Sequence, residues 1–245
     1  MIKSAFKSLA IACLALFPAA LPAQEVVADD PHRALALAVS SDEIAILRFE
    51  QDMKVSFETG IKQIPEMAQL DQDCPGFILG FGKVMRGPVY EGHMDDNIWY
   101  RGKLEELFRA RLSKEDAAGA ARFYGSEQGQ NLLAQAIASM TAENTVAEVL
   151  EDIDEDRPLS AEAYNADQVA TASRLLKKLS PEEMASLNAA LSQAKWFPKV
   201  MAIMPEVQAL GLELFNRDYS PELNAKIEAV AENFTNEHLK ACEAP

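Results

Sequence analysis

The chain has 245 residues, which is enough for one domain or two small ones with a buried core. Hydrophobic residues make up 49% of it and charged residues 25%, and these ordinary globular values exclude a disordered, collagen-like or coiled-coil chain. The formal net charge is -15. Nucleic acids and anionic lipids would repel such a chain, so we expect neither as its main partner.

The first residues have the pattern of a secretory signal peptide. Two early lysines precede an apolar run at 9–17, which is too short to span a bilayer, and Ala23 is a small residue of the kind found at cleavage sites. We therefore expect residues 1–23 to be removed and the mature protein to be periplasmic, without an integral membrane segment. Lipoprotein-type processing at Cys13 and a retained membrane helix are the alternatives.

Two cysteines, Cys74 and Cys242, are left in the predicted mature chain. In an oxidising compartment such a pair is expected to form a disulfide. The bridge would join the two ends of the mature chain, and the entropy of so long a loop predicts stabilisation on the order of 5 kcal/mol. The alternative is a pair of buried, unreactive thiols.

The first half of the chain gives a mixed pattern. Residues 24–40 show no helical periodicity and are expected to form an N-terminal lead-in. Apolar residues at spacings of three and four predict a helix over 42–69, with a glycine and a proline as kink positions. Glycines and prolines make 71–92 irregular, with a short helix at 77–86, and a further helix follows over 95–111.

Capping signals dominate the rest of the chain. Ser113 and Ser126 each precede an apolar helical pattern, and an acidic stretch at 146–160 is the best linker candidate. Helices are then predicted over residues 161–178, 181–196, 199–216 and 221–240. No segment alternates with period two between hairpin turns, so the fold class is all-α, a helical bundle of two units at 41–145 and 161–245.

A weak internal repeat suggests that the two units are related. Leu112-Ser113 and Leu179-Ser180 both stand before acidic residues and an Ala-rich helix. Duplication explains this pattern, but so does the general similarity of capped helix starts.

One motif resembles a known family. A Leu-Ser-x-Glu-Asp stretch at 112–116 is followed by Phe123-Tyr124-Gly125-Ser126-Glu127-Gln128-Gly129-Gln130. This resembles the bacterial family called domain of unknown function 2059, whose members share Phe-Tyr-x-Ser-Pro-x-Gly-x-Lys after a capped helix; Glu127 stands where proline is common. The resemblance covers roughly residues 95–140. It implies an exported all-α protein and assigns no activity.

The motif has a structural interpretation as a helix corner. Gly125 would end one helix in the left-handed conformation, Ser126 would cap the next, and Gly129 would let the ring of Phe123 or Tyr124 pack closely. The functional alternative is a ligand site at the hydroxyls of Tyr124 and Ser126.

Patterns for metal and nucleotide chemistry are incomplete, and we expect no metal and no cofactor. The histidines are scattered, and His93 beside Asp95 and Asp96 is typical of a solvated helix start. The acidic run at 152–156 lacks the glycine and the glutamate of a calcium loop. Residues 80–83 lack the spacing and the hydroxyl residue of a phosphate loop.

These observations favour a non-catalytic binding or structural module. Its active surface would be a groove between amphipathic helices that takes a helix of another protein or an apolar ligand. The aromatic candidates to line that groove are Trp99, Tyr100, Phe123, Tyr124, Trp196 and Phe197.

Two other function classes stay open. One is a small periplasmic hydrolase with a site near His93, Asp95, Tyr124 and Ser126. The other is a chaperone-like envelope factor, which would expose an apolar groove of several hundred Å².

Overall fold

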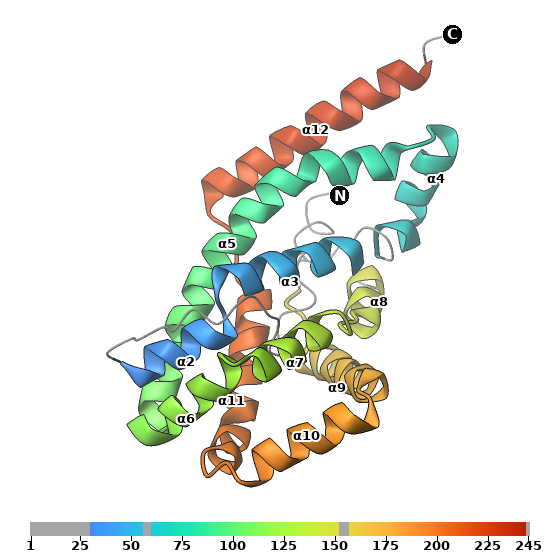
Figure 1. The fold of residues 1–245 in the computed structure, drawn as a ribbon. Helices are drawn as coiled ribbons and strands as arrows, with labels where there is room; N and C mark the ends of the chain where they lie inside the picture. Colours follow the sequence, from blue (N-terminus) through green and yellow to red (C-terminus); the bar gives the residue numbers. More distant parts are fainter. Residues whose placement is uncertain (1–29, 56–59, 152–156, 244–245) are drawn as a thin grey trace.

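The computed structural model describes residues 30–55, 60–151 and 157–243. Within these ranges the chain is helical and has no strand, which confirms the predicted all-α bundle (Figure 1). No helix of the described ranges combines the length and the apolar character that a membrane crossing requires. The predicted signal peptide at 1–23 lies outside them.

The elements follow one another with short connections. In chain order they are α2 (Pro31–Val39), α3 (Asp42–Val55), the 3-10 helix η2 (Ile61–Gln63), α4 (Pro65–Asp73), α5 (Phe77–Arg111), α6 (Lys114–Tyr124), α7 (Glu127–Ile137), α8 (Glu143–Glu151), α9 (Ala161–Lys178), α10 (Pro181–Ser192), α11 (Phe197–Phe215) and α12 (Pro221–Glu243). Serine side chains cap α6, α7, α9 and α10 by accepting a backbone N–H from the first turn. The helix starts predicted after Ser113, Ser126 and Ser180 are therefore confirmed.

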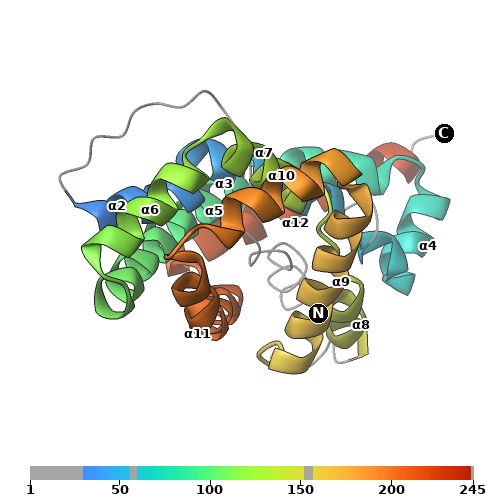
Figure 2. The same ribbon diagram turned by 60° about the horizontal axis from the view of Figure 1, so that its bottom comes forward.

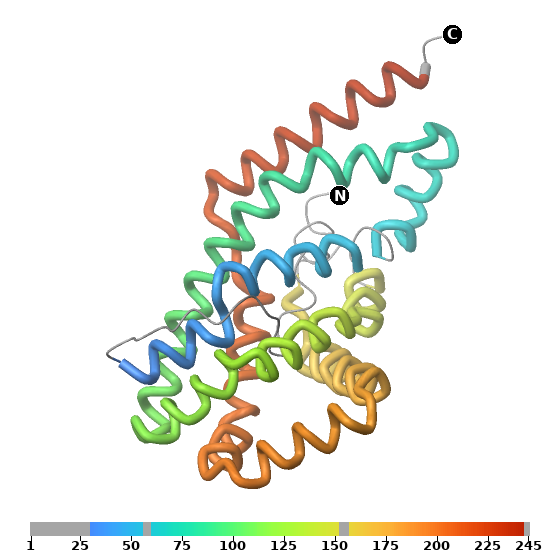
Figure 3. The backbone as a smooth tube through the Cα atoms, viewed as in Figure 1, coloured from blue at the N-terminus to red at the C-terminus, as the bar shows by residue number. Residues whose placement is uncertain are grey.

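Helix α5 is the centre of the packing. It has 35 residues, so it extends for about 50 Å, and it contacts α2, α3, α4, α11 and α12. It bends along its length in Figure 3, and it contains Pro88, which removes one backbone hydrogen bond from the helix. Because α11 and α12 pack on α5, the two predicted units share one hydrophobic core that runs from Leu35 to Leu223.

The predicted lead-in at 24–40 is wrong for its second half. Residues 31–39 form α2, in which Asp30 accepts a hydrogen bond from the His32 backbone at 3.0 Å and Pro31 occupies the first turn. Leu35, Ala36 and Val39 are buried against α5 and α6. A helix this short shows little periodicity, and its stability comes from tertiary packing.

The single helix predicted over 42–69 is also wrong. Helix α3 ends at Val55, residues 56–59 lie outside the described ranges, and a new helix begins at Pro65. Proline lacks an N–H and suits the first turn of a helix better than its interior, so the position read as a kink is a helix start.

The sequence predicts that residues 71–92 are irregular apart from a short helix at 77–86. The helix at 77–86 is confirmed, but it continues without a break through residue 92 and on to Arg111, so most of the predicted irregular segment is helix. Only residues 74–76, between α4 and α5, are irregular, with Gly76 at φ +90° directly before α5. Two other glycines allow α12 to lie against α5. A Cβ atom at Gly80 would come 2.7 Å from the Phe234 ring, and one at Gly92 would come 2.7 Å from the ring of Tyr219. These glycines are sites of close helix packing, which local sequence does not distinguish from turns.

The acidic linker predicted at 146–160 begins as a helix. Helix α8 reaches Glu151 and packs on α9 (Figure 2), while 152–156 lie outside the described residues.

The predicted cysteine pair is confirmed at bonding distance. Cys74 follows α4 and Cys242 lies at the end of α12, with Cα atoms 5.7 Å apart. The disulfide holds the far end of α12 beside the start of α5, where Figures 1 and 3 show the two helices side by side.

Replacement of Gly92 by alanine should separate α12 from α5. The new methyl group would overlap the Tyr219 ring, so we expect Gly92→Ala to lower the free energy of unfolding by about 1–3 kcal/mol. Urea denaturation of both proteins measures the change. Gly102→Ala in the same helix is the matched control, because nothing lies within 4 Å of its Cβ position. This control should be stabilised by up to about 1 kcal/mol, and equal effects in the two variants would contradict the close packing.

Candidate functional site

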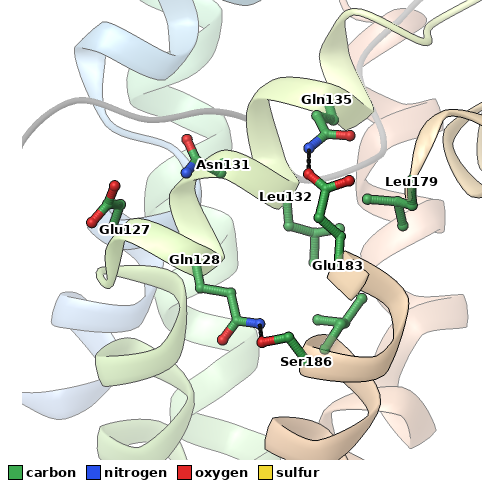
Figure 4. Close-up of a pocket in the computed structure, with 9 residues that line it drawn as sticks. Glu127, Gln128, Asn131, Leu132, Gln135, Leu179, Glu183 and Ser186 are labelled. Atoms are coloured by element: carbon green, nitrogen blue, oxygen red, sulfur yellow. Dashed lines mark hydrogen bonds between the residues drawn. The ribbon is translucent and has the colours of Figure 1, made fainter. Parts of the chain in front are cut away.

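A surface hollow lies between α7 and α10 (Figure 4). Helix α10 connects α9 to α11 (Figure 1), and its first turns lie opposite α7. The hollow has a volume of about 350 Å³. It is lined by Glu127, Gln128, Asn131, Leu132, Gln135, Leu179, Glu183, Ser186 and Leu187.

The α7 wall follows from helical periodicity. Glu127, Asn131 and Gln135 are spaced by four residues, and Gln128 and Leu132 stand beside them on the same face. The spacing is visible in the sequence, but a row of polar residues on a helix is typical of a solvated face. The sequence alone therefore does not indicate a site at these residues, because nothing in α7 shows that α10 lies opposite.

The α10 wall is positioned by a capping box. Ser180 accepts a hydrogen bond from the Glu183 backbone at 3.2 Å, and the Glu183 carboxylate accepts one from the Ser180 backbone at 2.8 Å. This fixes the Glu183 side chain at the edge of the hollow. No residue of α10 is buried, so the helix is a lightly packed wall.

Two side-chain hydrogen bonds connect the walls. Gln128 Nε2 donates to Ser186 Oγ at 3.0 Å, and Gln135 Nε2 donates to Glu183 Oε1 at 3.0 Å (Figure 4). The hydrogen bonds from Ser180, with the one from Gln135, lower the pKa of Glu183. Glu183 is therefore negatively charged at neutral pH.

The chemistry of the hollow suits binding. Two carboxylates, three amides and three leucines line it, and none of the nine lining residues is lysine, arginine or histidine. Such a surface complements an organic cation that also has an apolar part. Ser186 is the one hydroxyl residue of the lining, and it has no imidazole beside it to act as a base.

The Phe-Tyr-x-Ser motif forms the corner between α6 and α7, directly before the hollow. Ser126 Oγ accepts a hydrogen bond from the Gly129 backbone at 3.2 Å and donates one to the Phe123 carbonyl at 2.6 Å. A Cβ atom at Gly129 would lie 2.0 Å from that carbonyl oxygen. A side chain at position 129 would therefore collide with the backbone of Phe123. The expected reason for this glycine, the close packing of an aromatic ring, is wrong.

The expected left-handed conformation of Gly125 is also wrong. Its φ is -81° and its ψ is -9°, in the right-handed region. Its N–H donates to the Ala121 carbonyl at 2.8 Å, and the Ser126 N–H donates to the Phe123 carbonyl at 3.0 Å. These bonds satisfy carbonyls at the end of α6, so the corner closes without a left-handed residue.

Four of the six aromatic candidates form a packed cluster. The rings of Phe123, Tyr124, Trp196 and Phe197 make successive contacts with centroids 5.2–6.0 Å apart. Gly119 makes room for this cluster, since a Cβ there would lie 2.5 Å from Trp196. Tyr100 is buried in the core, and Trp99 lies under the Arg217 guanidinium at 5.4 Å. None of the six lines the hollow, so the expected aromatic groove is not found there.

The residues of the predicted hydrolase site have separate surroundings. His93 is buried on α5 with Nε2 2.8 Å from the Ala45 carbonyl of α3. Burial, with the charge of Arg48, lowers the pKa of His93 to about 4. Tyr124 packs against Trp196, and burial raises its pKa to about 12. Asp95 is exposed. These groups form no nucleophile–base arrangement.

His93 and Asp96 are buried ionisable residues of α5, at a place where the sequence predicted a solvated helix start. Asp96 is 3% exposed and forms an ion pair with Arg217. Burial raises the pKa of Asp96 to about 6, although Arg217 acts in the opposite direction. Burial also raises the pKa of the neighbouring Tyr219, helped by the charge of Asp96. The expectation of a solvated cap is therefore wrong for His93 and Asp96.

Comparison of the chain with models of protein families, with curated proteins and with solved structures gives no match. The resemblance to domain of unknown function 2059 thus stays a prediction from the motif. A function is therefore inferred from the residues that line the hollow between α7 and α10.

His93 and Asp96 should affect the pH dependence of stability in opposite directions. As pH falls from 6.5 to 4, the unfolded chain protonates His93 before the folded state does, which destabilises the fold. Over the same window the folded state protonates Asp96 first, which offsets that loss. Each contribution is on the order of 3 kcal/mol. Asp96→Asn should therefore lose stability more steeply than the wild type as pH falls, as measured by urea denaturation.

The exposed residue Glu232 provides the control for this pH experiment. Glu232→Gln should keep the wild-type slope between pH 6.5 and 4. A wild-type slope in Asp96→Asn would show that Asp96 does not offset His93.

The helix corner gives a second stability prediction. Gly129→Ala should destabilise the protein by about 1–3 kcal/mol or more, because its methyl group would meet a carbonyl oxygen that cannot rotate away. Ser126→Ala, which removes the cap, should cost about 1 kcal/mol. Thermal unfolding followed by circular dichroism ranks the two, and the reverse order would count against the backbone contact.

Proposed function

We propose that the protein is an exported, non-catalytic binding protein of the periplasm, and that its ligand is an organic cation with an apolar part bound between α7 and α10. The observation that carries the proposal is the lining of the hollow, which includes Glu127, Glu183 and three leucines and no basic residue. An amine could pair with the carboxylates while its alkyl part covers the leucines.

The charge of the chain supports this ligand class. A formal net charge of -15 raises the local concentration of cations near the surface. The amides of Gln128, Asn131 and Gln135 offer oxygen atoms that could accept hydrogen bonds from an ammonium group. The disulfide and the signal-peptide pattern support export, because disulfides persist in oxidising compartments.

The surroundings of the ionisable residues support a role without catalysis. His93 contacts α3 in the interior, and Tyr124 and Ser126 belong to the helix corner. None of them lines the hollow. A hydrolase would need a nucleophile and a base at hydrogen-bonding distance in a site that substrate reaches.

Binding of hexylamine tests the proposal, with hexanoate as the anionic probe of the same length. We expect hexylamine to shift the backbone amide resonances of α7 and of the start of α10, and hexanoate to leave them unchanged. Glu127→Gln should weaken hexylamine binding about two- to five-fold, the range for an exposed ion pair. The combined Glu127→Gln and Glu183→Gln variant should weaken it further, since both carboxylate charges are then removed.

Glu182→Gln is the matched control, because Glu182 is an exposed residue of the same helix turn but does not line the hollow. It should bind hexylamine like the wild type. Equal binding of hexanoate, or resonance shifts confined to other helices, would reject the proposed site.

A further inference from the structure

Three metal-ligating side chains meet at the end of the molecule where α4 and α12 are joined. Cys74, His238 and Cys242 each place one ligand atom within 4.8 Å of the others. The hollow between α7 and α10 uses none of them. The three residues therefore form a separate group with its own chemistry.

The helix geometry brings these atoms together. His238 and Cys242 are four residues apart on α12, so both side chains lie on one face of that helix. Cys74 ends α4, where its N–H donates to the Leu70 carbonyl at 2.8 Å. Cys74 Sγ lies 3.6 Å from the backbone oxygen of His238.

The imidazole of His238 is held in place by aromatic rings. Its centroid is 5.5 Å from that of Phe77 and 5.1 Å from that of Phe234. Its Nε2 atom is buried and has no hydrogen-bond partner among the described residues. Buried ring nitrogens usually have a partner, so an unpaired one on an imidazole that lies beside two cysteines indicates a place for a ligand.

We propose that reduction of the Cys74–Cys242 disulfide creates a zinc site in which the two thiolates and His238 bind one Zn²⁺ ion. Two sulfurs and one imidazole nitrogen are a ligand set that zinc accepts, and the fourth tetrahedral position is then open to water. In the disulfide form neither sulfur carries the negative charge that metal binding requires.

The reaction balances with a dithiol as the reductant. One thiolate of the dithiol attacks a sulfur of the bridge and forms a mixed disulfide, and its second thiol then resolves that intermediate. The dithiol is oxidised to a disulfide, and Cys74 and Cys242 are released as thiols. Zinc binding then displaces the two thiol protons, while His238 binds as the neutral imidazole.

The change from a disulfide to two zinc-bound thiolates needs only a small movement of the sulfur atoms. With zinc–sulfur bonds of about 2.3 Å in a tetrahedron, two thiolate sulfurs lie about 3.8 Å apart. The sulfurs would therefore move apart by about 2 Å from their bonded separation. Zinc would keep the end of α12 attached to α4 after the covalent bond is lost. By linkage it would also favour the reduced state of the pair.

A zinc titration of the full chain tests the proposal. The protein is reduced with a phosphine, freed of it without oxygen, and titrated with zinc against a chromophoric chelator. We expect one zinc per chain for the reduced protein and none for the oxidised protein. Cobalt in place of zinc should give a thiolate charge-transfer band in the reduced protein only.

Variants of α12 test whether His238 binds the metal together with the two thiolates. His238→Gln should weaken zinc binding at least about tenfold and change the visible cobalt spectrum. Glu237→Gln, at the exposed preceding position, should leave both unchanged. Circular dichroism of the oxidised variants checks that each one folds.

Three results would overturn the site. They are the absence of stoichiometric zinc binding by the reduced protein, equal binding by the oxidised protein, and an unaltered affinity and cobalt spectrum in His238→Gln.

Discussion

The fold depends on burial of α5 by helices from both halves of the chain. Side chains from Phe77 near its start to Phe108 near its end are buried by α2, α3, α4, α11 and α12. Its five glycines and its interior proline make α5 a poor helix former by itself, and the surrounding apolar contacts stabilise it. Because one helix contacts so many others, the rest of the molecule takes its position from α5.

Close approach of helices is the second constraint, and glycines satisfy it at several places. Gly80 and Gly92 admit rings of the α12 region against α5, and Gly119 admits Trp196 against α6. In each case an added methyl group would lie less than 3 Å from a ring atom. Packing as tight as this has no space for a side chain, so these positions depend on tertiary contacts that local propensity does not report.

The two proposed sites lie in different kinds of structure. The hollow has α10 as one wall, a helix with no buried residue that is connected to α7 by two side-chain hydrogen bonds. Cys74, Cys242 and His238 lie in a firmly held part of the structure, where a disulfide and aromatic rings fix the end of α12. Elements that open at low free-energy cost are suited to ligand entry, and rigid ones are suited to metal ligands.

Local sequence was sufficient wherever a helix carries its own start signal. Ser113, Ser126 and Ser180 cap their helices as expected, and apolar periodicity located α9, α11 and α12 to within a few residues. The cysteine pairing also followed from the sequence, because only two cysteines are left after the predicted cleavage. Caps and periodicity act within one or two turns, so they are present in the chain before it folds.

Features that need two distant segments were decided by the tertiary structure. Residues 87–94 joined the two predicted helices into one because α12 and α3 cover them, and α2 formed because α5 and α6 bury one face of it. The hollow exists only because Glu183 and Ser186 lie opposite Gln128 and Gln135. His238 joins the cysteines because α12 returns to the end of α4. No short-range pattern encodes such contacts, since their free energy arises only when the segments meet.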